Sequence, residues 1–271
     1  MRYLLIAAAA VLPAWSAAVA QDSQYGAPSP APAQLDDSTR IRIGIGAQLQ
    51  PKYVGDDGTS VGPLFHFNIA RNGQEFAFGA PDDSPGVAVV SSDGFSFGPS
   101  INLTGRRRES DVGAPVGNVA RTIEVGGFAQ YQAGDSWRLR AELRQGLNGH
   151  DGLVGEVSAD KIWRDGDRYV FSLGPRVMFS DARYQRAYFG VSPGASVASG
   201  LPEYRPGSGV HAVGVASGLT YALDDRWGLF GYAKYERLVG DAAKSPIVRT
   251  YGSRNQLSGG LGLNYTFTLS H

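Results

Sequence analysis

Apolar and polar residues alternate with a period of two along most of this chain. Between Arg40 and Gln50 the odd positions are apolar and the even positions are polar or glycine. Between Trp137 and Leu147 one parity is mostly apolar, and the other carries arginine and glutamate. Successive side chains of a β-strand point to opposite faces, so each segment predicts a strand with one apolar and one polar face. No helical period fits these segments.

The same alternation recurs often enough to predict an all-β fold of twelve antiparallel strands. The two weakest strands, 74–80 and 87–92, are short and contain or flank Gly and Pro. Such residues weaken a strand, and without these two the count is ten, which is also even. The strands are predicted at 40–50, 61–70, 74–80, 87–92, 94–104, 121–132, 136–147, 153–163, 168–180, 210–222, 226–238 and 256–267.

Short and long connections alternate between these strands. The long segments 105–120, 181–209 and 239–255 all fall at one end of the predicted sheet. Short periplasmic turns and longer external loops are typical of bacterial outer-membrane barrels. The pattern therefore predicts a transmembrane, up-and-down β-barrel with both termini in the periplasm. The tight turns at the other end are Asn72-Gly73, Asp93-Gly94, Gly134-Asp135, Asp165-Gly166 and Asp224-Asp225.

Aromatic residues distinguish this barrel from a soluble sandwich, which the period alone does not exclude. Each of Trp137, Trp163 and Trp227 flanks a predicted short turn. Trp and Tyr prefer the membrane interface, so these residues predict a girdle at the periplasmic end. The tyrosines expected in the same girdle are Tyr131, Tyr169, Tyr221 and Tyr265.

The start of the chain predicts export. Arg2 precedes an apolar run, and Ala18-Val19-Ala20 forms a small-residue cleavage site. The run is too short for a membrane-spanning helix, so residues 1–20 are predicted to be a signal peptide cleaved after Ala20. Residues 21–38, rich in Pro, Ala and Ser, are predicted to be a periplasmic tail, and residues 39–271 the barrel. No later stretch is long and apolar enough for a transmembrane helix.

Composition excludes some classes of protein. The chain of 271 residues has no cysteine, so it has no disulfide framework. Its 25 basic and 25 acidic residues give no bias toward nucleic acid, which a protein of the cell exterior would not meet. A content of 37 glycines and 13 tyrosines favours many short strands joined by tight turns.

Charged residues on the inward face predict a filled lumen. A hairpin turning near His150 would set Arg144 opposite Glu156 and Arg140 opposite Asp160, and it would bring Glu124 near Arg144. Such balanced charges favour structural ion pairs over a selective pore, which more often carries one sign of charge.

No catalytic, cofactor or metal site is predicted. The histidines are interpreted as isolated polar residues, because no Ser-His-acid set has a recognisable spacing and no GxSxG motif is present. A surface lipid hydrolase is the enzyme alternative. The four histidines are His66, His150, His211 and His271.

Three further motifs have a structural and a functional interpretation. Asp56-Asp57 and Asp82-Asp83 lack the pattern of a calcium loop and are interpreted as turns. Gly-x-Gly pairs such as Gly44 and Gly46 lie inside strands and are not a dinucleotide site. Arg106-Arg107-Arg108 opens an external loop, either as a solvated cluster or as a contact for lipopolysaccharide phosphates.

Four strings resemble the MipA/OmpV family of outer-membrane proteins, and the resemblance runs from about residue 43 to 267. They are PKYVGDD, LTGRRRES, ARYQRAYFGVSP and, most specific, YERLVGDAAKSPIV at Tyr235–Val248. In that last string, Gly240 and Pro246 are expected to fix a loop, and Asp241 to cap it or pair with Lys244 or Arg249, with no catalytic role.

The resemblance implies a non-enzymatic outer-membrane scaffold for peptidoglycan machinery. Its implied partners are a lytic transglycosylase and a peptidoglycan synthase, besides outer-membrane lipid and lipopolysaccharide. A narrow channel for small solutes, including cationic antibiotics, and an adhesin-like surface protein are the alternatives within the family.

Overall fold

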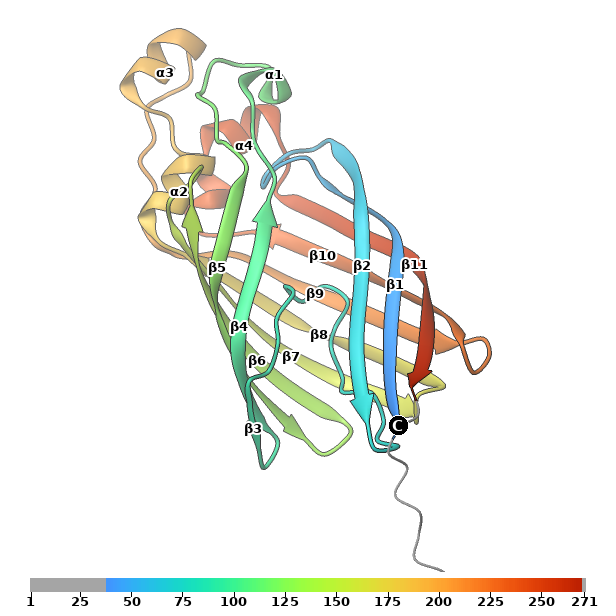
Figure 1. Ribbon diagram of the computed structural model, residues 1–271. Coiled ribbons are helices and arrows are strands. Elements are labelled where there is room, and N and C mark those ends of the chain that lie inside the picture. Colours follow the sequence, from blue (N-terminus) through green and yellow to red (C-terminus); the bar gives the residue numbers. More distant parts are fainter. Residues whose placement is uncertain (1–37, 270–271) are drawn as a thin grey trace, which may run out of the picture. The chain divides into compact units, whose positions relative to one another are not determined.

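The computed structural model describes residues 38–269, which form one curled antiparallel sheet of eleven strands (Figure 1). Consecutive strands pair along the chain from β3 to β11, and β1 pairs with both β2 and β11. The predicted all-β antiparallel fold is confirmed. The strands are β1 Thr39–Pro51, β2 Thr59–Arg71, β3 Val90–Ser92, β4 Phe95–Thr104, β5 Thr122–Ala133, β6 Trp137–Leu147, β7 Leu153–Asp165, β8 Tyr169–Ser180, β9 Gly209–Ala222, β10 Trp227–Leu238 and β11 Asn255–Leu269.

The segments predicted as signal peptide and tail lie outside the described residues, apart from residue 38, and both assignments stay predictions. Short helices occupy the long connections between strands. Within residues 38–269, no helix is long and apolar enough to cross a membrane. The helices are α1 Glu109–Val112, α2 Ala182–Phe189, α3 Pro193–Ser199 and α4 Pro246–Tyr251, with a 3₁₀ turn η1 at Ala242–Lys244.

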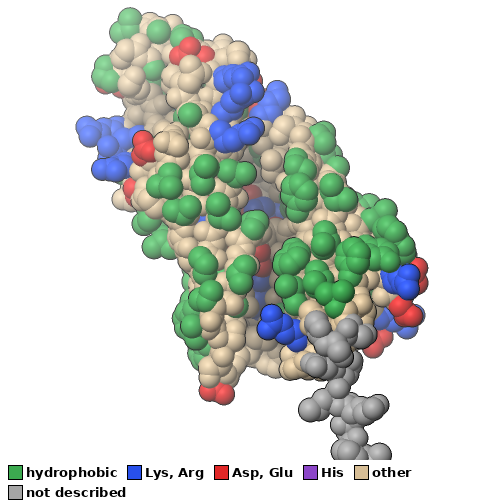
Figure 2. Space-filling model, in the orientation of Figure 1, with side chains coloured by type: hydrophobic (Ala, Val, Ile, Leu, Met, Phe, Trp, Pro, Cys, Tyr) green, Lys and Arg blue, Asp and Glu red, His purple; other side chains and the backbone are tan. Residues whose placement is uncertain are grey.

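The outward face of the sheet is apolar and the inward face is polar. Ile45, Phe65 and Leu261 are each more than 60% exposed, whereas Arg138 and Glu124 on the inward face are buried. Figure 2 shows hydrophobic side chains over the strands on both sides of a central hollow, with charged side chains visible inside it. This is the reverse of a soluble protein and is typical of a barrel whose outer face contacts lipid.

The segment 72–89, here called the inserted segment, replaces the strand predicted at 74–80 and the first half of the strand predicted at 87–92. Its first half lies beside β2, where the Asn68 side chain donates a 2.8 Å hydrogen bond to the Ala77 carbonyl. Its second half runs along β4, with Val87 N–H donating to the Pro99 carbonyl at 3.2 Å.

The prediction of a strand at 74–80 is therefore wrong, and the strand predicted at 87–92 shortens to β3. Twelve strands are not confirmed. Pro81 and Pro85 explain part of this result, because proline has no N–H to donate to a neighbouring strand. Among the described residues, β2 pairs only with β1, so the inserted segment occupies the wall between β2 and β4.

The short turns all lie at the end of the sheet where β1 begins and β11 ends. Both central residues of the first turn have positive φ, 55° at Asn72 and 67° at Gly73. Asn and Gly tolerate this conformation, which matches the twist of paired strands.

The predicted aromatic girdle is present at this end. Trp227 lies opposite Tyr265 in the sheet, with ring centroids 4.9 Å apart, and Tyr169 lies opposite Tyr221. Trp137, Trp163 and Trp227 are each about half exposed. Rings in this position suit a membrane interface, because they have an apolar body and a polar edge.

The long connections pack together at the opposite end of the sheet. This was predicted, because all three fall on the same side of the strands in the sequence. Their apolar side chains form a buried cluster that includes Tyr188, Phe189, Ala242 and Ile247. Asp181 begins α2 by accepting a 2.9 Å hydrogen bond from the Tyr184 backbone, which fixes how this helix enters the cluster. The described part of the chain therefore has a charged interior between its strands and its main apolar cluster where the long connections meet the strand ends.

Candidate functional site

Arginines and carboxylates pair across the inward face of β6 and β7, but not in the predicted register. Arg138 lies directly opposite Asp160, and their side chains are 2.6 Å apart. The predictions that Arg140 faces Asp160 and that Arg144 faces Glu156 are wrong by two residues. The turn is centred one residue earlier than expected, which moves every cross-strand pair by two.

A second chain of ion pairs follows the inward faces of β5 and β6. Arg144 lies 2.8 Å from Glu124, as predicted, and also 2.8 Å from Glu142. Glu142 in turn lies 3.2 Å from Arg140, whose guanidinium stacks over the Phe128 ring. All four charged side chains are at least nine-tenths buried, so the pairing offsets part of the cost of removing them from water.

The inserted segment supplies two carboxylates to this interior. Asp83 makes two contacts with the guanidinium of Arg138, and Asp82 makes two with Arg176, both at 3.0 Å. Arg176 also lies 2.9 Å from Asp160, so Asp160 is shared by both arginines. The interpretation of Asp82-Asp83 as simple turn residues missed this role, because the two arginines lie far away in the sequence.

The start of the inserted segment is held at the end of the sheet with the short turns. Phe76 N–H donates a 2.9 Å hydrogen bond to Asp167, which also pairs with Arg40 at 2.7 Å. The guanidinium of Arg42 stacks over the Phe76 ring at 4.0 Å. Together with the contacts of Asp82 and Asp83, they fix the inserted segment to the inward face of the sheet at two points.

Two of the four histidines are buried and partnered, so the interpretation of isolated histidines is wrong for them. His150 Nδ1 accepts a 3.0 Å hydrogen bond from Gly152 N–H, which places the proton of the neutral ring on Nε2. That proton is then donated to Glu124, 3.1 Å away. His150 thus joins the turn after β6 to the chain of ion pairs.

His211 makes a contact that no sequence motif indicates. Its Nδ1 lies 3.0 Å from the Ser180 hydroxyl, although 31 positions separate the two residues. Tyr184 and Phe189 lie over the His211 ring, and both members of the pair are buried. Within the described part of the chain no carboxylate hydrogen-bonds to His211. We therefore interpret the Ser180–His211 pair as a structural contact beneath α2.

His66 packs its ring 4.9 Å from that of Phe230, and its Nδ1 has no hydrogen-bond partner among the described residues. His271 lies outside the described residues. Asp56 is buried beside Gly252, and burial raises the pKa of its carboxyl group. Its position in a turn agrees with the interpretation from sequence.

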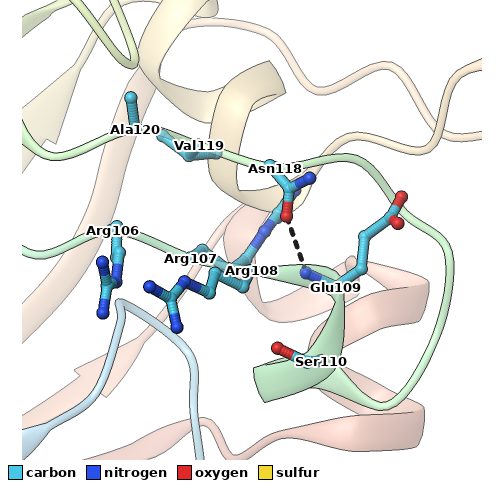
Figure 3. Close-up of a pocket in the computed structure, with 8 residues that line it drawn as sticks. All are labelled: Arg106, Arg107, Arg108, Glu109, Ser110, Asn118, Val119 and Ala120. Carbon is cyan, nitrogen blue, oxygen red and sulfur yellow. Dashed lines mark hydrogen bonds between the residues drawn. The ribbon is translucent and has the colours of Figure 1, made fainter.

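The arginine run at the start of the external loop divides into two faces. Arg107 is buried, and its guanidinium donates hydrogen bonds to the carbonyls of Tyr188, Val116 and Gly117. Burial lowers the pKa of Arg107. Arg106 and Arg108 point away from this interior and line a surface cavity of about 570 Å³ (Figure 3).

The loop carrying the family motif is built as expected. The Asp241 carboxylate accepts a 3.0 Å hydrogen bond from Gly207 N–H and lies 3.5 Å from Lys244. The Gly207 hydrogen bond, followed by Lys244, lowers the pKa of Asp241. Gly240 has a φ of 57°, which explains the glycine at this position.

Comparison with known proteins identifies the family. Residues 43–267 match the family described as MltA-interacting protein MipA. The chain belongs to the MipA family. It is accordingly an outer-membrane β-barrel protein, as its apolar outer face and polar interior also indicate. No curated protein matches the chain.

Several solved outer-membrane proteins have a similar outline. An outer-membrane channel of Pseudomonas putida F1 has 10% sequence identity and a TM-score of 0.43, over 89% of this chain and 100% of that one. The KdgM porin has 11% identity and a TM-score of 0.37, over 85% and 99% of the two chains. At this level of similarity the comparison carries nothing about function.

Proposed function

We propose that this MipA-family protein is a non-enzymatic scaffold that holds peptidoglycan-processing enzymes at the outer membrane. The end of the sheet with the short turns and both termini then faces the periplasm. There it binds a lytic transglycosylase and a peptidoglycan synthase, the partners that the family resemblance implies, and the family description names MipA as an MltA-interacting protein.

The buried ion pairs on the inward face are the observation that carries this proposal. Arg138 binds Asp83 and Arg176 binds Asp82, so these two arginines hold the inserted segment on the inward face of the sheet. A pathway for solutes requires water-filled space and ion sites that release their ions easily. Buried, mutually neutralised side chains instead favour a rigid platform.

The periplasmic end offers an acidic surface for a partner. Within the described residues, the short turns and adjacent strand ends carry five exposed aspartates against three exposed arginines. Hydrogen bonds from the Trp227 and Arg226 backbone N–H groups lower the pKa of Asp224, so this turn is anionic at neutral pH. The aspartates are Asp93, Asp135, Asp165, Asp224 and Asp225, and the arginines are Arg71, Arg168 and Arg226. A basic face on the bound enzyme complements this surface.

Binding of the full mature protein to a purified lytic transglycosylase tests the proposal. Reversing two turn charges with Asp135→Lys and Asp225→Lys is expected to weaken binding about tenfold, mainly through slower association. The matched control reverses two exposed charges at the other end, Asp57→Lys and Glu203→Lys, and is expected to bind as the unmodified protein does.

Cross-linking in intact cells gives the independent check. Recovery of wall hydrolases or synthases supports the scaffold, and their absence together with no binding in vitro would overturn it. Planar-bilayer recording tests the channel alternative. Steady conductance from well-folded protein would favour a channel, whereas a silent trace is expected for a filled lumen.

A further inference from the structure

Arg106 and Arg108 project from the same face of a short β-ladder just beyond β4. Arg107 pairs with Val119 across this ladder, with backbone hydrogen bonds of 3.0 and 2.8 Å in the two directions. Residues on either side of a paired strand residue point to the opposite face. Because Arg107 points inward, its two neighbours point together into the cavity beside Ala120, as Figure 3 shows.

Arg107 holds this geometry rigid and adds charge to it. It is 2% exposed, and its guanidinium reaches only carbonyl oxygens, the nearest being that of Tyr188 at 2.6 Å. Among the described residues no carboxylate lies within 4.0 Å of it, and its Nε has no hydrogen-bond partner. A buried cation without a counter-charge therefore forms part of the cavity wall.

The acidic groups nearest in sequence do not neutralise the cavity. Glu109 accepts a 2.8 Å hydrogen bond from Gly117 N–H, and Asp111 accepts one of 3.2 Å from the Arg108 backbone N–H. Neither carboxylate forms an ion pair with Arg106 or Arg108 in the described structure. The guanidinium donors of these two arginines are thus free for an external anion.

The position of the cavity relative to the membrane selects the kind of anion. Leu103, 64% exposed, is the last lipid-facing apolar residue of β4. Arg106 lies three residues further, about 10 Å along the strand at about 3.3 Å per residue. With a strand tilt of roughly 40°, this is about 8 Å above the hydrocarbon boundary, within the headgroup layer.

We propose that Arg106 and Arg108 bind a phosphate group of a glycolipid in the outer leaflet. Planar guanidinium groups bind phosphate oxygens through paired hydrogen bonds, which a flexible lysine does not reproduce. The acyl chains lie along the apolar outer face below Leu103, where β4 borders the wall occupied by the inserted segment. The assignment uses the membrane orientation given above and is otherwise independent of the scaffold function.

Titration of the full mature protein in neutral detergent with bisphosphorylated lipid A tests this site. The double substitution Arg106→Gln and Arg108→Gln is expected to weaken binding about a hundredfold, tenfold for each lost charge-assisted contact. The double substitution Arg106→Lys and Arg108→Lys keeps both charges. Its affinity for lipid A is expected to lie between that of the unmodified protein and that of the glutamine variant. The control, Arg183→Gln with Arg186→Gln, removes two exposed arginines of α2 outside the cavity and is expected to change nothing.

Two further ligands identify the source of the phosphate. Dephosphorylated lipid A is expected to bind the unmodified protein weakly. Its affinity should equal that of bisphosphorylated lipid A for the glutamine variant. Inorganic phosphate is expected to compete only at far higher concentration, since it lacks the apolar contacts. Equal affinity for inorganic phosphate and lipid A would overturn the lipid assignment. Unchanged lipid binding by a glutamine variant that folds normally, judged by heat-modifiable migration, would overturn the site itself.

Transglycosylase binding separates this inference from the scaffold proposal. The glutamine variant is expected to bind the enzyme as the unmodified protein does, because its substitutions lie at the external end. Loss of lipid binding with retained enzyme binding therefore supports the phosphate site independently of the scaffold.

Discussion

Replacing Asp82 and Asp83 by asparagine is expected to release the inserted segment from the lumen. Each substitution keeps the shape of the side chain and removes its charge. Arg138 and Arg176 are then left with Asp160 as a shared partner, 2.6 and 2.9 Å away. Two positive charges in the interior would then share the fully buried Asp160, and the only further carboxylate among the described residues would be Glu156, 3.6 Å from Arg176.

The magnitude follows from the burial of these groups. The side chain of Arg138 is 0% exposed and that of Arg176 is 1% exposed. Removing one partner of a buried ion pair costs about 3–5 kcal/mol, and the shared Asp160 favours the lower value of about 3 kcal/mol for each substitution. Because both aspartates hold the same segment, the first substitution already loosens the contact of the second, and the double variant is expected to lose about 5 kcal/mol rather than the full sum.

Urea unfolding of protein in lipid vesicles measures this loss of stability, and proteolysis locates it. Chymotrypsin is expected to cleave the double variant after Phe76, which is 4% exposed in the intact structure. The control, Asp57→Asn with Asp93→Asn, makes the same chemical change in exposed turns that form no ion pair in the described structure. If the double variant matched this control in stability and in protease resistance, the two aspartates would not be what holds the segment.

Two further predictions concern single sites. Hydrogen bonding lowers the pKa of Asp241, so its contact with Gly207 N–H is stable above the ordinary carboxyl pKa of about 3.9 and is lost as the pH falls through the lowered value. The amide chemical shift of Gly207 is expected to report that transition, and Asp241→Asn to abolish it. At Gly98 an added Cβ would lie 1.8 Å from the Val87 carbonyl oxygen, so Gly98→Ala is expected to remove the hydrogen-exchange protection of the Val87 amide. Gly79→Ala is the control, because nothing lies within 4 Å of its added Cβ, and equal protection in both variants would contradict the prediction.

Local alternation was sufficient to predict ten of the strands within a few residues of their ends. In the stretch from Trp137 to Leu147, burial alternates at every position as the sequence does. The sequence signal for a strand is local, because it depends only on whether each side chain faces the lipid or the interior. In the arginine run, by contrast, the pairing of Arg107 with Val119 decides which arginines face outward. That pairing could not be predicted from the local pattern.

Register was harder to predict than strand position. The hairpin between β6 and β7 turns through Asn148 and Gly149, both with positive φ, rather than around His150. His150 is instead drawn into the interior by Glu124. A one-residue error in the turn changes the partner of Arg138 and of every other residue on the strand. Such an error is invisible in the alternation, because the parity of each strand is unchanged.

The inserted segment could not be found by local pattern because its position depends on partners far away. Asp83 lies 55 residues from Arg138, and Asp82 lies 94 residues from Arg176. Had this segment formed two complete wall strands, both arginines would have lost these partners and kept only Asp160 and, for Arg176, Glu156, in an interior where an unpaired charge is costly. The same two aspartates therefore hold the segment between β2 and β4 against the inward face of the sheet. Releasing the segment would enlarge the space inside the sheet, so the double asparagine variant is expected to lose stability and gain conductance together. Conductance in the unmodified protein, with the segment still protected from chymotrypsin, would separate the two and contradict this account.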